Sequence, residues 1–372
     1  MAKILYGVSG EGSGHSSRAK IIAEHLIEQG HEVKIATYDR GIANLKDHFD
    51  VIEICGLSIE TKDNKIDKSR TFSRNLQILP EAQKKMNILR KIAIKEFQPD
   101  CVITDFEPQT AYLANYYDLP LLTLDNQHRL RYLDFKYPPH LIADAILTEN
   151  IIRAMVPRPD FSIFTAFYEG KITNKRSYQT PPLIRNEILN LQPTNGNVIL
   201  VYLTKGFDSL KETLKKYKRE KFVLYGYHEP HQEGNIQFKP FNNDEFLKDL
   251  ANCKAVIATA GFTLMTEAFY LGKPYFATPM IGQFEQEYNG YMMEKIGFGR
   301  SMEKMDETKI SAFLYEIPDY REKLKHHRHV GNEIVFNKLD QLLEHDLKLL
   351  KSHHAKRSIT HKLESVFDFL DI

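Results

Sequence analysis

The residues best suited to chemistry lie near the amino terminus, where alternating glycines precede a histidine. The run Val8-Ser-Gly-Glu-Gly-Ser-Gly-His15 follows an apolar stretch and precedes an amphipathic one. Glycine lets the backbone approach a ligand closely, and the free amides that open a helix favour negative charge. We therefore expect an anion-recognising turn that includes Gly14, followed directly by an imidazole that can accept a proton.

A second concentration of small and polar residues lies in the later part of the chain. It consists of Thr259-Ala-Gly-Phe-Thr-Leu-Met-Thr-Glu267 and Gly282-Gln-Phe-Glu-Gln-Glu-Tyr-Asn-Gly290. Gly261 permits a tight turn into a helix, and the first amides of that helix, with the Thr263 hydroxyl, suit a diphosphate. This part of the chain is therefore expected to bind a diphosphate group.

These runs resemble the donor-binding signature of GT-B nucleotide-sugar glycosyltransferases. The resemblance is greatest to the group that includes the peptidoglycan N-acetylglucosaminyltransferase, diacylglycerol galactosyltransferases and small-molecule glucosyltransferases. It implies that Glu267 accepts hydrogen bonds from ribose hydroxyls, and that Glu285 and Gln286 bind the transferred sugar. Small-molecule glucosyltransferases carry a histidine where this chain has Thr259, a departure that favours the peptidoglycan side of the group. The residues expected at the donor diphosphate are Gly14, Thr204, Lys205, Gly261, Phe262 and Thr263.

On the acceptor side, the resemblance makes His15 the general base for the attacking hydroxyl. Asp105 and Asp125 each end an apolar strand-like run, so either one can orient His15 or hold the acceptor. We expect Asp105 to act with His15, although aspartates after parallel strands also serve as helix caps. The residues expected around the acceptor are Glu107, Asp125, His128 and Arg129.

The elements that must position these residues follow the rhythm of a parallel α/β fold. Strand-like and helix-like runs alternate from Lys3 to Leu124, break in a proline-rich stretch, and resume at Asn197. The resemblance and this rhythm predict two Rossmann-like domains facing a cleft, the GT-B architecture, with a C-terminal helix bracing them. The expected divisions are an acceptor-binding domain at 1–188, a donor-binding domain at 189–330 and a helical extension at 331–372.

Composition excludes several classes of function. Lys and Arg total 50 against 49 Asp and Glu, so no overall positive field favours a nucleic-acid partner. The three cysteines lie in apolar runs, a pattern typical of reduced thiols in the cytoplasm. No run approaches the roughly twenty apolar residues of a membrane span. The basic segment Thr61–Arg70 is consistent with peripheral contact at an anionic membrane, or with an ordinary charged loop.

Neither a metal nor another cofactor is expected. The chain has no Asp-x-Asp triad, its nearest match being Asp105-Phe-Glu107, so a diphosphate-chelating cation lacks its usual ligands. The histidine-rich segments near 326–329 and 353–354 lack the spacing of a zinc site. We expect the helix that follows Gly261, together with Lys205, to take the place of the cation.

The sequence therefore predicts a metal-independent, inverting transfer of a sugar from a nucleotide-sugar, expected to be a UDP-sugar. The expected acceptor is a hydroxyl of a cell-envelope lipid or glycan, met in the cytoplasm or at the inner face of the membrane. Two alternatives stay open: a UDP-sugar 2-epimerase of the same architecture, and a non-catalytic nucleotide-sugar-binding protein. A dehydrogenase is disfavoured because its Gly-x-Gly-x-x-Gly spacing is absent.

Overall fold

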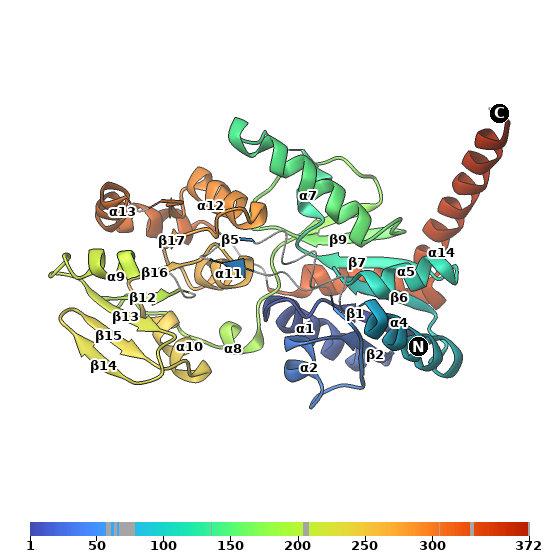
Figure 1. Ribbon diagram of the computed structural model, residues 1–372, viewed down its shortest axis with the longest axis horizontal. Coiled ribbons are helices and arrows are strands. Elements are labelled where there is room, and N and C mark those ends of the chain that lie inside the picture. The colour runs from blue at the N-terminus through green and yellow to red at the C-terminus, as the bar shows by residue number, and fades with distance from the viewer. Residues whose placement is uncertain are drawn as a thin grey trace. The chain divides into compact units, whose positions relative to one another are not determined.

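The computed structural model describes residues 1–56, 61–62, 65–66, 79–134, 136–203, 208–304, 306–327 and 331–370. They form two compact units, each built on a seven-stranded sheet (Figure 1). Unit 1 comprises Met1–Ser58, Ser69–Leu183 and Val330–Ile372, and unit 2 comprises Ile59–Lys68 and Ile184–His329.

The sheet of unit 1 is parallel throughout and doubly wound. Its strand order is β11-β9-β7-β6-β1-β2-β3, so the winding direction reverses between β1 and β6. Ligands of open α/β sheets bind at the carboxyl ends of the strands at such a reversal. The strands are β1 (Lys3–Val8), β2 (Glu32–Thr37), β3 (Val51–Glu53), β6 (Cys101–Asp105), β7 (Leu121–Asp125), β9 (Phe161–Thr165) and β11 (Ser177–Thr180).

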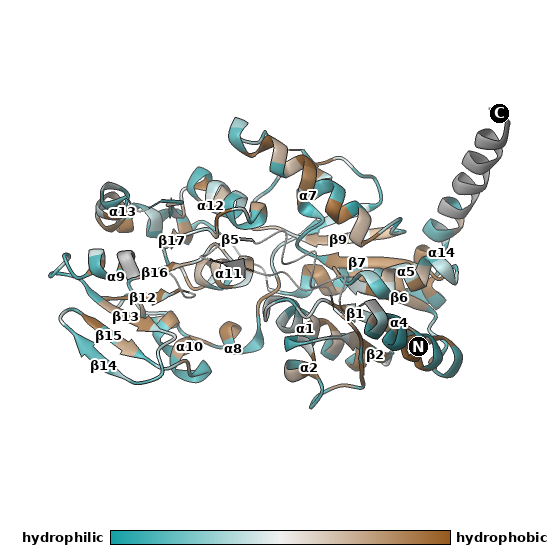
Figure 2. Cartoon of the chain, viewed as in Figure 1, coloured by the Kyte–Doolittle hydropathy of each residue, from teal (hydrophilic) through white to brown (hydrophobic). Residues whose placement is uncertain are grey.

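Helices cover both faces of this sheet, as the near-continuous burial of its strands requires. One core cluster joins α1 to the even-numbered residues of β1, and another joins the odd-numbered Leu5 to the helices that precede and follow β6. Figure 2 shows the apolar colouring of β7 and β9. The helices of unit 1 are α1 (Gly14–Glu28), α2 (Arg40–Leu45), α4 (Leu79–Leu89), the π-helix η1 (Arg90–Phe97), α5 (Pro108–Tyr116), α6 (Arg129–Tyr132), the 3-10 helix η2 (Pro139–Leu141) and α7 (Ile142–Met155). Two short antiparallel strand pairs are also present: β8 (Leu133–Asp134) with β10 (Lys171–Ile172) in unit 1, and β4 (Thr61–Lys62) with β5 (Lys65–Ile66) in the Ile59–Lys68 segment of unit 2.

The chain returns to unit 1 after completing unit 2. Helix α14 (Glu333–Leu370) contains non-helical backbone at residues 344–347, so it consists of two helices joined at a kink. Its apolar side chains Val335, Leu339, Leu342, Leu343, Leu347 and Leu350 lie in the same core cluster as β1 and α1. The predicted C-terminal helix is thus present, and its apolar side chains pack in the core of unit 1.

Unit 2 repeats the doubly wound plan. Its strand order is β14-β15-β13-β12-β16-β17-β18, with β14 antiparallel and the winding reversed between β12 and β16. The strands are β12 (Val198–Tyr202), β13 (Lys221–Tyr225), β14 (His231–Glu233), β15 (Ile236–Lys239), β16 (Ala255–Ala258), β17 (Tyr275–Ala277) and β18 (Gly299–Ser301). The helices are α8 (Asn186–Leu189), α9 (Asp208–Leu214), α10 (Asn243–Asn252), α11 (Phe262–Tyr270), α12 (Phe284–Ile296) and α13 (Glu307–Lys325).

The division into units differs in detail from the domain limits expected from sequence. The second segment of unit 1 ends at Leu183, where the sequence led us to expect 188, and the segment Val330–Ile372 groups with unit 1, where we expected a separate extension. The proline-rich stretch before residue 196 contains β9 and β11, which extend the parallel sheet.

Candidate active site

The turn between β1 and α1 depends on its glycines. A Cβ placed on Gly10 would lie 2.1 Å from the Tyr38 carbonyl oxygen, and Gly12 has a φ of +71°. Helix α1 begins at Gly14, and among the described residues no side chain caps its first amides. The turn therefore presents uncapped backbone N–H groups at the reversal point of the unit 1 sheet.

His15 lies in the first turn of α1 and contacts the end of β6. Its Nδ1 is 2.7 Å from Oδ1 of Asp105, whose side chain is fully buried, whereas the His15 side chain is 12% exposed. The two residues meet because β6 pairs with β1, so the carboxyl ends of both strands lie together. Among the predicted site residues, His15 and Asp105 thus form a hydrogen-bonded pair.

Arg18, one turn further along α1, contacts the same carboxylate. Its Nε donates to Oδ2 at 2.8 Å and its Nη2 donates to Oδ1 at 2.7 Å. Burial alone would raise the pKa of Asp105, but the Arg18 charge and the hydrogen bonds from His15 and Arg18 outweigh it, so the pKa is lowered. Asp105 is therefore held as an ionised carboxylate. Arg18 was not predicted as a site residue, although its spacing of three from His15 places both residues on one face of the helix.

Asp125 does not orient His15. Its Oδ1 accepts from the backbone N–H of His128 at 2.8 Å, and its Oδ2 lies 2.7 Å from Nδ1 of the same histidine. Both side chains are fully buried. The Nε2 of His128 has no hydrogen-bond partner among the described residues. Asp125 and His128 thus form a second buried pair in the loop after β7.

Glu107 and Arg129 are both buried and hydrogen-bonded within unit 1. Glu107 is the N-cap of α5, and its carboxylate accepts from the N–H groups of Gln109 and Thr110 and from the Thr110 hydroxyl. Arg129 is fully buried and donates to the carbonyl of Asn126. Both side chains are fully buried, and the acceptor-side role expected for Glu107 and Arg129 stays a prediction. Pro108 at the first helical position was the available signal that Glu107 caps a helix.

In unit 2, hydrogen bonds to two backbone carbonyls hold the turn from β16 into α11, and the space beside Gly261 is open. The Tyr275 hydroxyl donates to the Thr259 carbonyl at 2.7 Å, and the Asn289 amide donates to the Ala260 carbonyl at 2.9 Å. Gly261 is the N-cap, and a Cβ built on it meets no atom within 4 Å. Phe262 is buried and Thr263 is half-buried in the first turn. The helix start thus has room for an anion.

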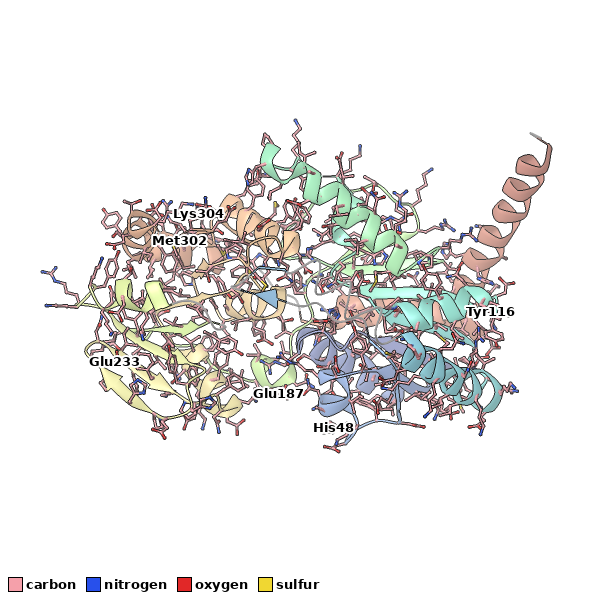
Figure 3. The ribbon with its side chains drawn as sticks, viewed as in Figure 1. His48, Tyr116, Glu187, Glu233, Met302 and Lys304 are labelled. Carbon is pink, nitrogen blue, oxygen red and sulfur yellow. The ribbon has the colours of Figure 1, made fainter. Side chains whose placement is uncertain are left out.

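Glu267, one turn further, is 2% exposed and paired with Arg185. Arg185 Nε donates to Oε1 at 2.7 Å and its Nη2 donates to Oε2 at 3.0 Å. Burial raises the pKa of Glu267 and the Arg185 charge opposes the rise. Exposed Glu187, labelled on α8 in Figure 3, adds negative charge near this pair. Nothing in the sequence indicated that Arg185 would pair with Glu267.

Glu285 and Gln286 open helix α12 and are half-buried. Gln286 accepts from the Met280 N–H at 3.0 Å and donates to Gln283 Oε1 at 2.7 Å. The hydrogen bonds of Gln286 therefore order the loop that precedes α12. Thr204 and Lys205 lie outside the described residues.

A cavity of about 780 Å³ lies elsewhere in unit 2, at the amino ends of β12 and β13. Lys215, Lys218, Arg219 and Lys221 line it together with Glu233, which Figure 3 labels on β14. Because β12 and β16 are parallel, this cavity is at the opposite edge of the sheet from the Gly261 turn. It is separate from the candidate donor site.

Within the described part of the chain, no three His, Cys, Asp or Glu side chains gather as a metal site. None of the helices searched over the same residues is both long and apolar enough to cross a bilayer.

Two doubly wound α/β units with these helix-start turns define a GT-B architecture, and solved structures agree. The glycosyltransferase of kitacinnamycin has a TM-score of 0.66 and 15% identity, covering 91% of this chain and 98% of its own. The calicheamicin glycosyltransferase CalG4 has a TM-score of 0.64 and 14% identity, covering 93% and 99%. UGT2 of Phytolacca americana has a TM-score of 0.63 and 12% identity, covering 96% and 100%.

The chain belongs to glycosyl transferase family 1, whose family model matches residues 2–318. An uncharacterized glycosyltransferase of Methanosarcina mazei is 24% identical over 371 residues, covering 89% of this chain and 95% of its own. Another, from Methanosarcina acetivorans, is 24% identical over 382 residues, covering 93% and 98%. The protein is a glycosyltransferase, as the sequence motifs predicted.

Proposed function

We propose that this glycosyltransferase transfers a sugar from a UDP-sugar to a hydroxyl of a cell-envelope lipid or glycan, with inversion. The main support for the proposal is the 2.7 Å contact between His15 Nδ1 and Oδ1 of Asp105, a buried and ionised carboxylate. This contact lies at the carboxyl ends of β1 and β6, where the strand order of the unit 1 sheet reverses. A carboxylate that accepts from Nδ1–H leaves Nε2 unprotonated and so able to take a hydroxyl proton.

In the proposed reaction, His15 Nε2 accepts the proton as the acceptor oxygen attacks the anomeric carbon. The bond from that carbon to the β-phosphate oxygen breaks, and the nucleoside diphosphate leaves from the opposite face. Inversion follows from this in-line displacement. The protein's contribution is a positioned base, worth roughly 10²- to 10⁴-fold in rate.

The donor is proposed to bind unit 2. The uncapped start of α11 at Gly261 would hold the diphosphate, and Glu267 would accept from the ribose. Two structural neighbours support a nucleoside diphosphate donor: the Phytolacca americana enzyme was solved with UDP-2-fluoro-glucose, and the spinosyn rhamnosyltransferase SpnG with thymidine diphosphate. Glu285 is proposed to bind the sugar hydroxyls, because a carboxylate can accept two of them.

No metal is assigned to this reaction. We propose that the backbone amides at the start of α11, together with a lysine, stabilise the leaving diphosphate in place of a cation. Lys205, outside the described residues, stays the candidate for that lysine.

A lipid acceptor, met at the cytoplasmic face of a membrane, is supported by helix α7. It exposes Ile142, Ile146, Leu147 and Ile151, each between 47% and 58% accessible. Exposed apolar side chains grouped on one helix mark surfaces that meet a membrane or a partner. The predicted basic segment Thr61–Arg70 lies largely outside the described residues.

The test is a mass-spectrometric assay of UDP-, GDP- and dTDP-sugars with and without lipid acceptors, using wild type and His15→Ala. Transfer that depends on both acceptor and His15 supports the proposal. Interconversion of a UDP-sugar without acceptor would indicate an epimerase instead. Donor binding without turnover, unaffected by His15→Ala, would indicate a binding protein.

A further inference from the structure

Arg18 is a buried cation directly beneath the proposed base. Its side chain is 6% exposed and grips both oxygens of Asp105, which has no exposure. Such a two-point contact between guanidinium and carboxylate fixes the carboxylate's orientation as well as its charge. The rotation of Asp105 is therefore set by Arg18, whether or not His15 is bound to it.

The same guanidinium also touches the imidazole. Arg18 Nη2 lies 3.1 Å from His15 Nδ1, while Asp105 Oδ1 lies 2.7 Å from that nitrogen. A guanidinium has donors only, and an ionised carboxylate has acceptors only. At 2.7 Å from a carboxylate oxygen, Nδ1 must carry a hydrogen, because two lone pairs would otherwise face each other. The Arg18 cation therefore lies against an N–H rather than against a lone pair.

A cation in that position opposes the addition of a second proton to the ring. Among the residues that the structure describes, the other charged or titratable groups that face this cluster are Tyr6 on β1 and Asp125 on β7. Burial raises the pKa of Tyr6, so its phenol stays neutral. Asp125 is already bonded to His128. The negative charge of Asp105 favours protonation of the His15 ring, and the positive charge of Arg18 opposes it.

We infer that Arg18 is a positioning residue that holds Asp105 ready for Nδ1–H and keeps His15 neutral, with Nε2 free to accept the acceptor's proton. This inference rests on the proposed function, in which His15 is the general base. A role limited to neutralising buried Asp105 would leave the protonation of His15 unchanged, so the two roles differ in a measurable way.

The first test is the pH dependence of kcat/KM for wild type, Arg18→Lys and Arg18→Gln. Glutamine keeps a donor for Asp105 but removes the charge, so the acid limb should move to higher pH by roughly one to three units. Lysine keeps the charge but loses the two-point contact, so its rate should fall with the acid limb unmoved. An unmoved limb in Arg18→Gln would overturn the inference.

The second test does not require turnover. The ring signals of His15, identified by their absence in His15→Gln, are followed by NMR through a pH titration of wild type and Arg18→Gln. An upward shift of the His15 midpoint in Arg18→Gln supports the inference, and equal midpoints refute it. If His15→Gln retains full transfer, the proposed base is wrong, and the titration still reports on Arg18 separately. Far-UV circular dichroism establishes that each variant is folded.

Discussion

Arg185 donates to both carboxylate oxygens of Glu267, at 2.7 and 3.0 Å, and the carboxylate is 2% exposed. An ionised carboxylate can accept about four hydrogen bonds, so two sites remain once Arg185 has taken its share. Arg185 therefore orients the Glu267 carboxylate and leaves part of its hydrogen-bond acceptor capacity for a ligand. It also means that each partner contributes to the stability of unit 2.

The first prediction concerns the loss of Arg185. Arg185→Met leaves a buried carboxylate without its cation, and should lower the free energy of unfolding by about 3 kcal/mol near neutral pH. The pKa of Glu267 is already raised by burial and will rise further in the variant. The folded state then binds more protons than the unfolded state, so the free energy of unfolding falls as pH rises above the usual glutamate range.

The measurement is chemical unfolding of wild type and Arg185→Met at pH 5 and pH 8. The penalty should be larger at the higher pH. Arg185→Lys, which keeps the charge, should show a smaller penalty with little dependence on pH. Equal penalties for Arg185→Met at both pH values would contradict this account.

A matched pair of carboxylate variants separates ribose binding from sugar binding. Glu267→Gln should weaken binding of free UDP roughly ten-fold or more, since hydrogen bonds to a charged group contribute about 1.5–3 kcal/mol. Glu285→Gln should leave UDP affinity unchanged and weaken only the intact UDP-sugar. Calorimetric titration with UDP and with UDP-sugar distinguishes the two. If Glu267→Gln binds UDP as wild type does, the ribose assignment is wrong.

Two glycines that look alike in sequence should respond differently to alanine. The φ of −69° and the open surroundings of Gly261 accept a Cβ without strain, so Gly261→Ala should unfold like wild type. The added methyl group would occupy space proposed for the diphosphate, so UDP affinity should fall by about ten-fold, or 1.4 kcal/mol.

Gly10→Ala is the control. Its Cβ would lie 2.1 Å from the Tyr38 carbonyl, so Gly10→Ala should destabilise the protein by about 1–3 kcal/mol, whereas Gly261→Ala should not. Unchanged UDP binding in Gly261→Ala would mean that the phosphates bind elsewhere.

The fold was predictable from sequence because apolar runs fixed the strands and glycines fixed the turns. The apolar stretch before the first glycine run and the amphipathic stretch after it agree with β1 and α1. The short strands β9 and β11 were not predicted individually, because nearby prolines obscured four- and five-residue runs.

Site residues were harder to predict because chain order does not give strand order. Asp105 and Asp125 both end buried strands, so the expectation that Asp105 acts with His15 had no strand order behind it. The sheet decides, because β6 is the neighbour of β1 and β7 is one strand further away. Arg18 and Arg185 were missed as partners because each pairs with a carboxylate more than eighty residues away.

The charge on Asp105 should make part of the protein's stability dependent on pH. Its pKa is lowered in the folded state, so its contribution is fully present above the unfolded aspartate value near ~3.9 and is lost as pH falls through the folded value. Asp105→Asn should therefore cost about 3 kcal/mol at neutral pH, and the cost should shrink below pH ~4. Asp50→Asn, which breaks an exposed pair with Lys34, should cost less than about 1 kcal/mol at every pH. A cost for Asp105→Asn that does not change in acid would show that its charge is not what stabilises the fold.

The exposed apolar side chains of helix α7 allow the proposed lipid acceptor to be tested. Ile146 and Leu147 are 58% and 48% exposed, and Figure 2 shows apolar colouring along this helix. If α7 inserts into a lipid surface, burying each side chain contributes about 1.5–3 kcal/mol. The double variant Ile146→Ser, Leu147→Ser should then lose most of its co-sedimentation with vesicles of phosphatidylglycerol and phosphatidylcholine. Tyr315→Ser, at an isolated position 86% exposed on α13, should co-sediment like wild type. Equal vesicle binding by all three proteins would remove the support that α7 gives to a lipid acceptor, and would favour a water-soluble glycan.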